Sequence, residues 1–130
     1  MKAKVLIVDD DVAITQQLFW MLCDDYEVTT ANDLASAIRR TTIYEPAIVL
    51  LDLNLPPTLD APDSGMRILE YIKGHFAAAT VFIISSALNS ETERACIEGG
   101  ADGFFSKPLE IENLLATVRR TTLARHLGVA

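Results

Sequence analysis

Cysteine is almost absent from this sequence, whose 130 residues include only Cys23 and Cys96. Two isolated thiols are too few for the disulfide framework of a small secreted domain or for a four-ligand zinc site. Each lies in a segment with helical spacing of apolar residues, so we expect both to be unpaired thiols that pack in the core. Neither a disulfide-stabilised fold nor a structural zinc centre is expected.

Long hydrophobic runs are also missing. The apolar stretches are four to six residues long, whereas a membrane-spanning helix needs about 20 apolar residues. Residues 1–4 lead directly into an apolar strand and do not resemble a signal peptide. We therefore expect a cytoplasmic protein that does not enter a membrane.

Basic residues are scarce as well. Eleven Lys and Arg stand against eighteen Asp and Glu, which gives a net charge of −7 and a pI of about 4.7. Direct binding to DNA, RNA or an anionic membrane requires clustered basic side chains, and this composition argues against it. Metal ions or basic protein partners fit the charge better.

What the sequence does contain is an alternation of short apolar segments, typical of buried strands, with amphipathic segments of helical spacing. The expected strands are residues 5–8, 27–31, 47–52, 81–84 and 103–106. The expected helices are residues 11–23, 33–44, 65–76, 90–98 and 110–126. Five such strand–helix units predict an α/β fold, with a parallel sheet between helical layers, in one domain of residues 1–130.

The segment 47–51 organises this sheet. Five consecutive apolar residues, followed by Asp52, predict a central strand that is buried on both faces. The segment 27–31 is shorter and more polar and suits an edge. Ligands of open α/β sheets bind at the carboxyl ends of the strands, near a switch in strand order. Asp52 is therefore expected at the functional edge of the sheet.

Charged and hydroxyl side chains follow several of the expected strands. Asp9 and Asp10 follow the first strand and Asp52 ends the third, while Ser85 follows the fourth and Lys107 the fifth. We expect these strand ends to meet. Clustered carboxylates repel unless a cation occupies the site, and carboxylate, carbonyl and water oxygens suit Mg²⁺. A carboxylate nucleophile, Mg²⁺, an ammonium and a hydroxyl are what phosphoryl transfer to an aspartate needs.

Each of these residues also has an ordinary explanation when taken alone. An Asp or Ser after a strand is usually a turn or helix cap, and a Lys–Pro step usually belongs to a loop. Their joint occurrence at the ends of the first, third, fourth and fifth strands favours a functional site.

Four stretches together resemble the receiver domain of two-component response regulators, and the resemblance covers essentially the whole chain. They are VLIVDDD (5–11), IVLLDLNLP (48–56), GAD (100–102) and FSKP (105–108). The resemblance implies a flavodoxin-like, doubly wound sheet of five parallel strands in the order 2-1-3-4-5, flanked by five helices. It also implies a domain that accepts a phosphoryl group from a histidine kinase or phosphotransfer protein in a Mg²⁺-dependent reaction.

The resemblance further implies roles for the acidic residues. Asp52 becomes the phosphorylated residue. Asp10, Asp52 and the backbone carbonyl of Asn54 become direct ligands of Mg²⁺, or of Mn²⁺ in its place. Asp9 becomes the second member of the acidic pair and contributes through water.

Phosphoryl-binding and switch residues are implied in the same way. Lys107 pairs with the phosphoryl group, and Pro108 follows a cis peptide bond, which X–Pro steps tolerate. Family spacing, counted back from the Gly-Ala-Asp motif and from the lysine, assigns the switch hydroxyl to Ser85 rather than Ser86. The switch aromatic is Phe104, for which an ordinary strand aromatic is the alternative. Because it is Phe, a hydrogen-bonded inward state is excluded.

Phosphorylation is then expected to act as a two-state switch. The surface formed by residues 90–98, 103–106 and 110–126 would change its preference for an output partner or domain, and the same surface is a candidate for homodimer formation. The domain promotes chemistry on itself, so the expectation is a self-phosphorylating and self-dephosphorylating switch rather than a turnover enzyme.

Two features depart from the family pattern. The connection from Asp52 to Gly65 is about five residues longer than usual, and longer surface loops cost little entropy. A tolerated insertion explains this, with control of access by residues 57–63 as the alternative. Ala87, two residues after Ser85, has no side chain to orient an attacking water, which implies a longer phosphoryl lifetime.

Three other functions fit these residues less well. A related aspartate-nucleophile phosphatase usually carries a second acid two residues after the nucleophile, where Asn54 stands. A receiver-like module that is never phosphorylated usually lacks the acidic pair, the acceptor or the lysine. A flavin-binding fold would want a hydroxyl-rich loop at residues 9–11. Ala130 is either a natural terminus or a boundary before an output domain.

Overall fold

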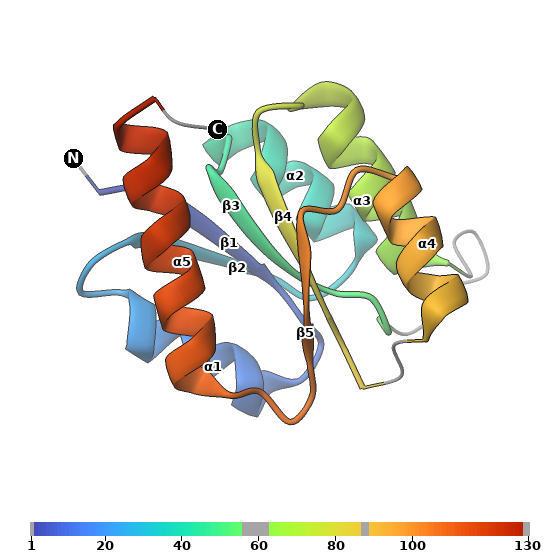
Figure 1. Ribbon diagram of the computed structural model, residues 1–130, viewed down its shortest axis with the longest axis horizontal. Helices are drawn as coiled ribbons and strands as arrows, with labels where there is room; N and C mark the ends of the chain where they lie inside the picture. The colour runs from blue at the N-terminus through green and yellow to red at the C-terminus, as the bar shows by residue number, and fades with distance from the viewer. Residues whose placement is uncertain (1, 56–62, 87–88, 129–130) are drawn as a thin grey trace.

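The protein is described by a computed structural model that covers residues 2–55, 63–86 and 89–128. Strands and helices alternate along the chain (Figure 1). The strands are β1 (Lys4–Val8), β2 (Glu27–Ala31), β3 (Ile48–Asp52), β4 (Thr80–Ser85) and β5 (Gly103–Ser106). The helices are α1 (Val12–Leu22), α2 (Leu34–Tyr44), α3 (Ser64–His75), α4 (Ser90–Glu98) and α5 (Ile111–His126). Every expected element is confirmed, with ends that differ by at most one residue.

The strands form one parallel sheet in the order β2-β1-β3-β4-β5. This order, which the family resemblance implied, is confirmed. β3 lies in the centre with all five residues buried, and β2 lies at an edge, as their sequences predicted. The chain moves outward one way from β1 to β2 and the other way from β3 to β5. The switch in strand order therefore lies between β1 and β3, where α/β proteins place their ligands.

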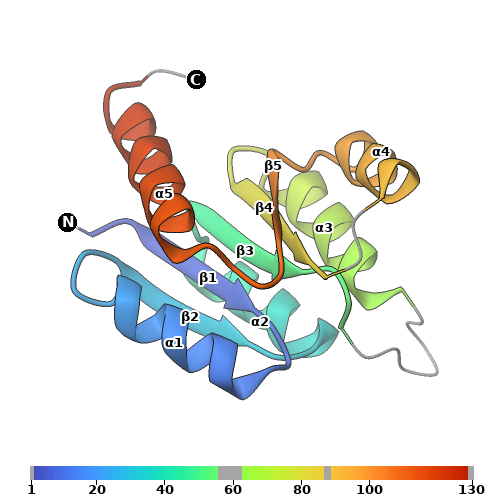
Figure 2. The same ribbon diagram turned by 60° about the horizontal axis from the view of Figure 1, so that its bottom comes forward.

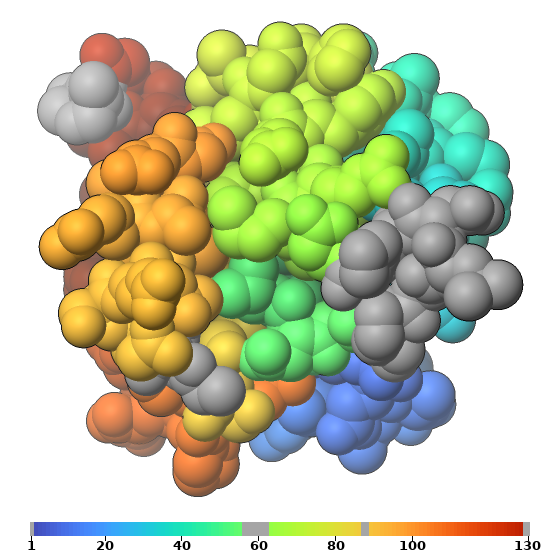
Figure 3. Space-filling model, turned by 90° about the vertical axis from the view of Figure 1, so that its right-hand side faces the viewer, coloured from blue at the N-terminus to red at the C-terminus, as the bar shows by residue number. Residues whose placement is uncertain are grey.

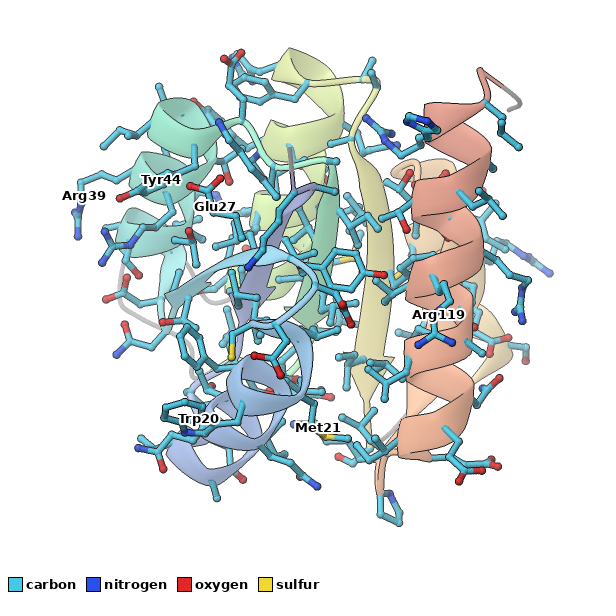
Figure 4. All side chains as sticks on the ribbon, turned by 90° about the vertical axis from the view of Figure 1, so that its left-hand side faces the viewer. Trp20, Met21, Glu27, Arg39, Tyr44 and Arg119 are labelled. Atoms are coloured by element: carbon cyan, nitrogen blue, oxygen red, sulfur yellow. The ribbon has the colours of Figure 1, made fainter. Side chains whose placement is uncertain are left out.

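Helices cover both faces of the sheet, because neighbouring residues of a buried strand point to opposite sides. Val49 and Leu51 of β3 pack in a cluster with residues of α2, α3 and α4. Ile48 and Leu50 pack in a second cluster with residues of α1 and α5. The space-filling view shows α3 between α4 and α2 on the first face (Figure 3). Figure 4 shows α1 and α5 on the other.

The start of α3 packs unusually close to the end of β3. A Cβ atom built on Gly65 would lie 2.3 Å from the carbonyl oxygen of Leu53, a distance that real Cβ atoms do not adopt. Gly65 is therefore the residue type that this approach requires. The contact fixes α3 against the chain segment that directly follows Asp52.

One expectation about the apolar residues is wrong. Cys96 is buried in the core, but Cys23 is only half-buried, because it follows the last residue of α1 and its thiol meets the carbonyl of Trp20 instead. On α4, Cys96 is buried whereas its neighbour Ile97 is 60% exposed. α4 lies at the edge of the layer (Figure 1), so only the narrow side that bears Cys96 meets α3. None of the helices in the described ranges is long and apolar enough to cross a membrane.

Candidate functional site

Three carboxylates gather at the sheet edge where β1 and β3 end, which Figure 2 brings forward. Val8 and Leu51 are partners in the parallel register, so the residues that follow them lie level with each other. Asp9 and Asp52 are buried, each only 3% exposed, whereas Asp10 is exposed. One oxygen from each of the three carboxylates lies within 4.8 Å of the others. The expected meeting of these strand ends is confirmed.

Local turns orient the two buried carboxylates in the same way. Oδ1 of Asp9 accepts a hydrogen bond from the backbone N–H of Asp11, at 2.9 Å. Oδ1 of Asp52 accepts one from the backbone N–H of Asn54, also at 2.9 Å. An Asp side chain often bonds the backbone two residues on, which tightens a turn. In both residues Oδ1 is held by the chain, and Oδ2 is the oxygen that meets the neighbouring strands.

Lys107 lies between these Oδ2 atoms. Its Nζ atom is 3.2 Å from Oδ2 of Asp9 and 3.2 Å from Oδ2 of Asp52. The backbone N–H of Lys107 donates to the carbonyl of Ser85 at 3.0 Å, which extends the pairing of β4 with β5 to this position. The Lys107–Pro108 peptide bond is cis, as the resemblance implied. The end of β5 thus delivers an ammonium to the ends of β1 and β3.

The end of β4 brings a hydroxyl to the same edge. Ser85 is buried, and its Oγ atom donates a hydrogen bond to Oδ1 of Asn54 at 2.5 Å. Ser86, the alternative switch residue, is exposed. The buried position of Ser85 agrees with the family spacing that selected it.

Burial is the largest influence on the pKa of Asp9. It raises the pKa of this carboxyl, and the nearby charge of Asp52 raises it further. The N–H of Asp11 and the charge of Lys107 lower it, but the sum still moves the pKa from 3.8 to about 6. Burial lowers the pKa of Lys107, whereas the charges of Asp52 and Asp9 raise it, and the net direction is upward. Lys107 therefore stays charged at neutral pH.

The donor set fits a hard divalent cation. Among the described residues, the buried Oδ2 atom of Asp9 accepts no hydrogen bond, and its contact with Lys107 is an ion pair alone. Three carboxylates gather here, and Lys107 pairs with two of them, so ionisation of the whole cluster leaves negative charge at the edge. Carboxylate oxygens with additional waters are the ligands that Mg²⁺ prefers. The cluster could bind such an ion.

Phe104 lies on β5, three residues before Lys107 in the sequence. It is half-buried, is the register partner of Ile83, and packs against the core cluster on the α3 side of the sheet. Its neighbour Phe105 is buried on the opposite side, edge-on to Phe82 with ring centroids 5.6 Å apart. Phe104 therefore lies between the core and the surface, and the expected switching role remains a prediction.

Two features of this edge were not foreseen from the sequence. One is the hydrogen bond between the side chains of Ser85 and Asn54, because the resemblance implies a role at the site for the backbone carbonyl of Asn54 and none for its side chain. The other is a hollow of about 270 Å³ beside Asp10, between α1, β2 and α2, whose lining includes Thr15 and Arg40. No local sequence pattern predicts this hydrogen bond or this hollow, because both depend on how separate elements pack together.

Part of the expected site lies outside the described residues. Ala87, considered for its effect on water attack, is one such residue, and so is the stretch 56–62, which makes up most of the long connection. The expectations about phosphoryl lifetime and access through this loop therefore remain predictions.

Comparison with known proteins gives a consistent result. The family model described as "Response regulator receiver domain" matches residues 5–119. The transcriptional regulatory protein KdpE of Staphylococcus aureus is 32% identical over 120 residues, which cover 92% of this chain and 49% of KdpE. The chain spans about half the length of the curated relatives that it matches.

Solved structures show the same similarity. The BeF3-activated DrrB receiver domain superposes with a TM-score of 0.82 at 28% identity, covering 94% of this chain and 98% of that domain. NtrX from Brucella abortus gives a TM-score of 0.82 at 31% identity, covering 98% of this chain and 29% of NtrX. In NtrX the matching part is thus a minor portion of a larger protein.

Proposed function

The chain belongs to the response regulator receiver domain family of two-component systems, and from this membership we propose that Asp52 is its phosphorylated residue. The general function of the family is a switch controlled by phosphorylation. The observation that carries the residue assignment is the position of Asp52, which is buried at the end of the central strand with Lys107 Nζ 3.2 Å from its Oδ2 atom.

The proposed reaction transfers a phosphoryl group to the Asp52 carboxylate. A carboxylate oxygen attacks phosphorus, a new P–O bond forms, and the bond from phosphorus to the donor breaks with its electron pair leaving on the donor. For a phosphohistidine donor, the released imidazole nitrogen then takes up a proton. Lys107 is already within ion-pair distance of Asp52 and offsets negative charge on the transferred group.

Mg²⁺ is the cation that we propose for the acidic cluster, and Mn²⁺ could replace it. Asp10, Asp52 and the backbone carbonyl of Asn54 would hold it, with Asp9 acting through water. When bound, such an ion neutralises charge on the phosphoryl oxygens. The buried Oδ2 atom of Asp9, which accepts no hydrogen bond within the described ranges, supports a role for this residue next to a cation.

The proposed output of the site is a change at the surface formed by α4, β5 and α5. The Ser85 hydroxyl would donate to a phosphoryl oxygen on Asp52, and Phe104 would repack beside it. α4 buries only Cys96 among its residues, so little packing opposes its adjustment. This mechanism makes the domain a switch that reacts once per signal rather than a turnover enzyme.

The proposed partners follow from the same chemistry. The phosphodonor would be a histidine kinase or a histidine phosphotransfer protein. The surface of α4, β5 and α5 would control an output domain or protein, and it is also where we propose that two copies could pair. The single domain of residues 1–130 would then be the signal-receiving half of a longer regulator, which fits the coverage of KdpE.

Acetyl phosphate tests the assignment directly. The intact mass of the protein should increase by one phosphoryl group in the presence of Mg²⁺, and this increase should be absent without a divalent cation. Asp52→Asn should abolish it, while Asp24→Asn, which changes an exposed aspartate after α1, should leave it intact.

Two outcomes would contradict the proposal. Labelling that persists in Asp52→Asn would place the phosphoryl group on another residue. No labelling of the wild-type protein with acetyl phosphate or a phosphohistidine donor would favour a receiver-like module that works without phosphorylation.

A further inference from the structure

The side chain of Asn54 has a task at this site beyond the metal-binding carbonyl of the same residue. Ser85 Oγ donates to Asn54 Oδ1 at 2.5 Å, which joins the end of β4 to the turn after β3. We propose that Asn54 is a positioning residue that holds the Ser85 hydroxyl in the unphosphorylated protein and must release it when Asp52 is phosphorylated. This proposal rests on the proposed function and deepens it.

The backbone around Ser85 is fixed, so only the side chain can change partner. The N–H of Leu53 donates to the carbonyl of Ile84 at 3.0 Å, which continues the pairing of β3 with β4. On the other side, the N–H of Lys107 donates to the carbonyl of Ser85, also at 3.0 Å. Rotation about the Ser85 side-chain bond is therefore the available movement.

Competition arises because a hydroxyl carries a single proton. The side-chain oxygen of Asn54 and the oxygens of a phosphoryl group are both acceptors. The hydroxyl can therefore donate either to Asn54 or to the phosphoryl group, but not to both at once. Ser85 is only 1% exposed, so the exchange takes place between protein groups with little help from solvent. The hydrogen bond to Asn54 therefore favours the unphosphorylated arrangement.

The three functions of Asn54 can be separated experimentally. Its backbone N–H donates to Asp52 and its backbone carbonyl is the proposed metal ligand, and both persist in Asn54→Ala. Only the bond to Ser85 is removed. A net hydrogen-bond contribution corresponds to a change of about 2- to 10-fold in an equilibrium constant.

Beryllofluoride, the phosphoryl mimic carried by the activated DrrB domain, is the probe for this test. Its apparent Kd in the presence of Mg²⁺ is measured by titration of amide NMR signals for wild type, Asn54→Ala, Ser85→Ala and the double variant. We expect Asn54→Ala to bind about 2- to 10-fold more tightly. In the Ser85→Ala background, Asn54→Ala should have no further effect, because the bond is already absent.

Two controls accompany this double-mutant cycle of Asn54 and Ser85. Ser86→Ala removes the neighbouring exposed hydroxyl and should leave the Kd unchanged. The Mg²⁺ affinity of every variant is measured without beryllofluoride, so that each beryllofluoride titration is carried out at a saturating Mg²⁺ concentration. Asn54 is exposed, so its substitution should not prevent folding, and the amide spectrum verifies this.

The outcomes separate the two proposals. An unchanged or weaker affinity in Asn54→Ala, or an equal shift in both Ser85 backgrounds, overturns the role of Asn54 while the wild type still binds the mimic. Wild-type protein that fails to bind beryllofluoride at all overturns the proposed function, and the role of Asn54 with it.

Discussion

Asp9, Asp10 and Asp11 follow one another in the sequence, yet the fold gives each a different environment. Asp9 is buried beside Lys107, and Asp10 is exposed within the carboxylate cluster. Asp11 is the N-cap of α1, where its Oδ1 atom accepts from the N–H of Ala13 at 2.9 Å. Substitutions of these adjacent aspartates therefore remove the same charge from different environments and can serve as controls for one another.

Asp10→Asn should weaken Mg²⁺ binding by at least about tenfold, because it removes the charge of a proposed direct ligand. Asp11→Asn removes the same charge one residue later and retains a good N-cap, so its affinity should remain near that of the wild type. Isothermal titration calorimetry with Mg²⁺ measures both. Equal losses in the two variants would mean that net charge, rather than a ligand at Asp10, sets the affinity.

Which residues gather at the ends of the strands could largely be predicted from the sequence. Acids after two strands and a Lys–Pro step after a third identified Asp9, Asp52 and Lys107, because parallel strands end at one edge. Their burial and exact partners were not accessible, since those depend on register and side-chain rotation. The hydrogen bond from Ser85 to Asn54 could not be predicted for this reason, because it depends on how far the ends of β3 and β4 extend relative to each other.

Two glycines of α3, Gly65 and Gly74, provide a second pair of comparable substitutions. Gly65→Ala would place a Cβ atom 2.3 Å from the carbonyl oxygen of Leu53, whereas a Cβ atom at Gly74 meets nothing within 4 Å. Relief of the clash requires the backbone of α3 or of the β3 end to shift, so we expect Gly65→Ala to lower the free energy of unfolding by about 2 kcal/mol or more. Gly74→Ala should be neutral or raise it, by up to about 1 kcal/mol, through helix propensity.

Urea unfolding followed by far-UV circular dichroism compares the two alanine variants. Gly65→Ala should also slow labelling by acetyl phosphate, because the strained contact directly follows the turn that holds Asp52. Equal stability of the two variants would show that α3 can move away from β3 without cost, against the close packing described.

At the scale of elements, periodicity predicted every strand and helix but not how widely each helix meets the core. α4 shows the limit. Cys96 and Ile97 are adjacent apolar residues, yet only Cys96 is buried. A helix at the edge of a layer has neighbours on one side, and no local pattern reports which helices lie at the edge. That information comes from strand order, which the family resemblance supplied and periodicity did not.

The whole molecule should lose stability as Asp9 ionises. Burial raises the pKa of this carboxyl from 3.8 to about 6 in the folded protein. The folded state thus holds the proton more tightly than the unfolded chain. The stabilisation from this bound proton is complete below about pH 4 and is lost as the pH rises through about 6. One pKa unit is about 1.4 kcal/mol, so in the absence of divalent cations the loss is at most about 3 kcal/mol.

Asp9→Asn isolates this contribution. The variant should be more stable than the wild type at pH 7 without metal, and the two should converge near pH 4. Added Mg²⁺ should stabilise the wild type at pH 7 and do so progressively less below pH 6, because the cation needs ionised carboxylates. Parallel pH profiles of wild type and Asp9→Asn, measured by urea unfolding in EDTA, would contradict this account.

Trp20 on α1 determines what the intrinsic fluorescence of the protein can report. It is the single tryptophan of the sequence and is 71% exposed (Figure 4). It stands eight residues after Val12, the first residue of α1, which is about 12 Å along the helix axis. An indole that is mostly exposed to water emits much as it does in the unfolded chain. Its fluorescence should therefore change little on unfolding or on phosphorylation at Asp52. It should shift to shorter wavelength when another protein covers α1.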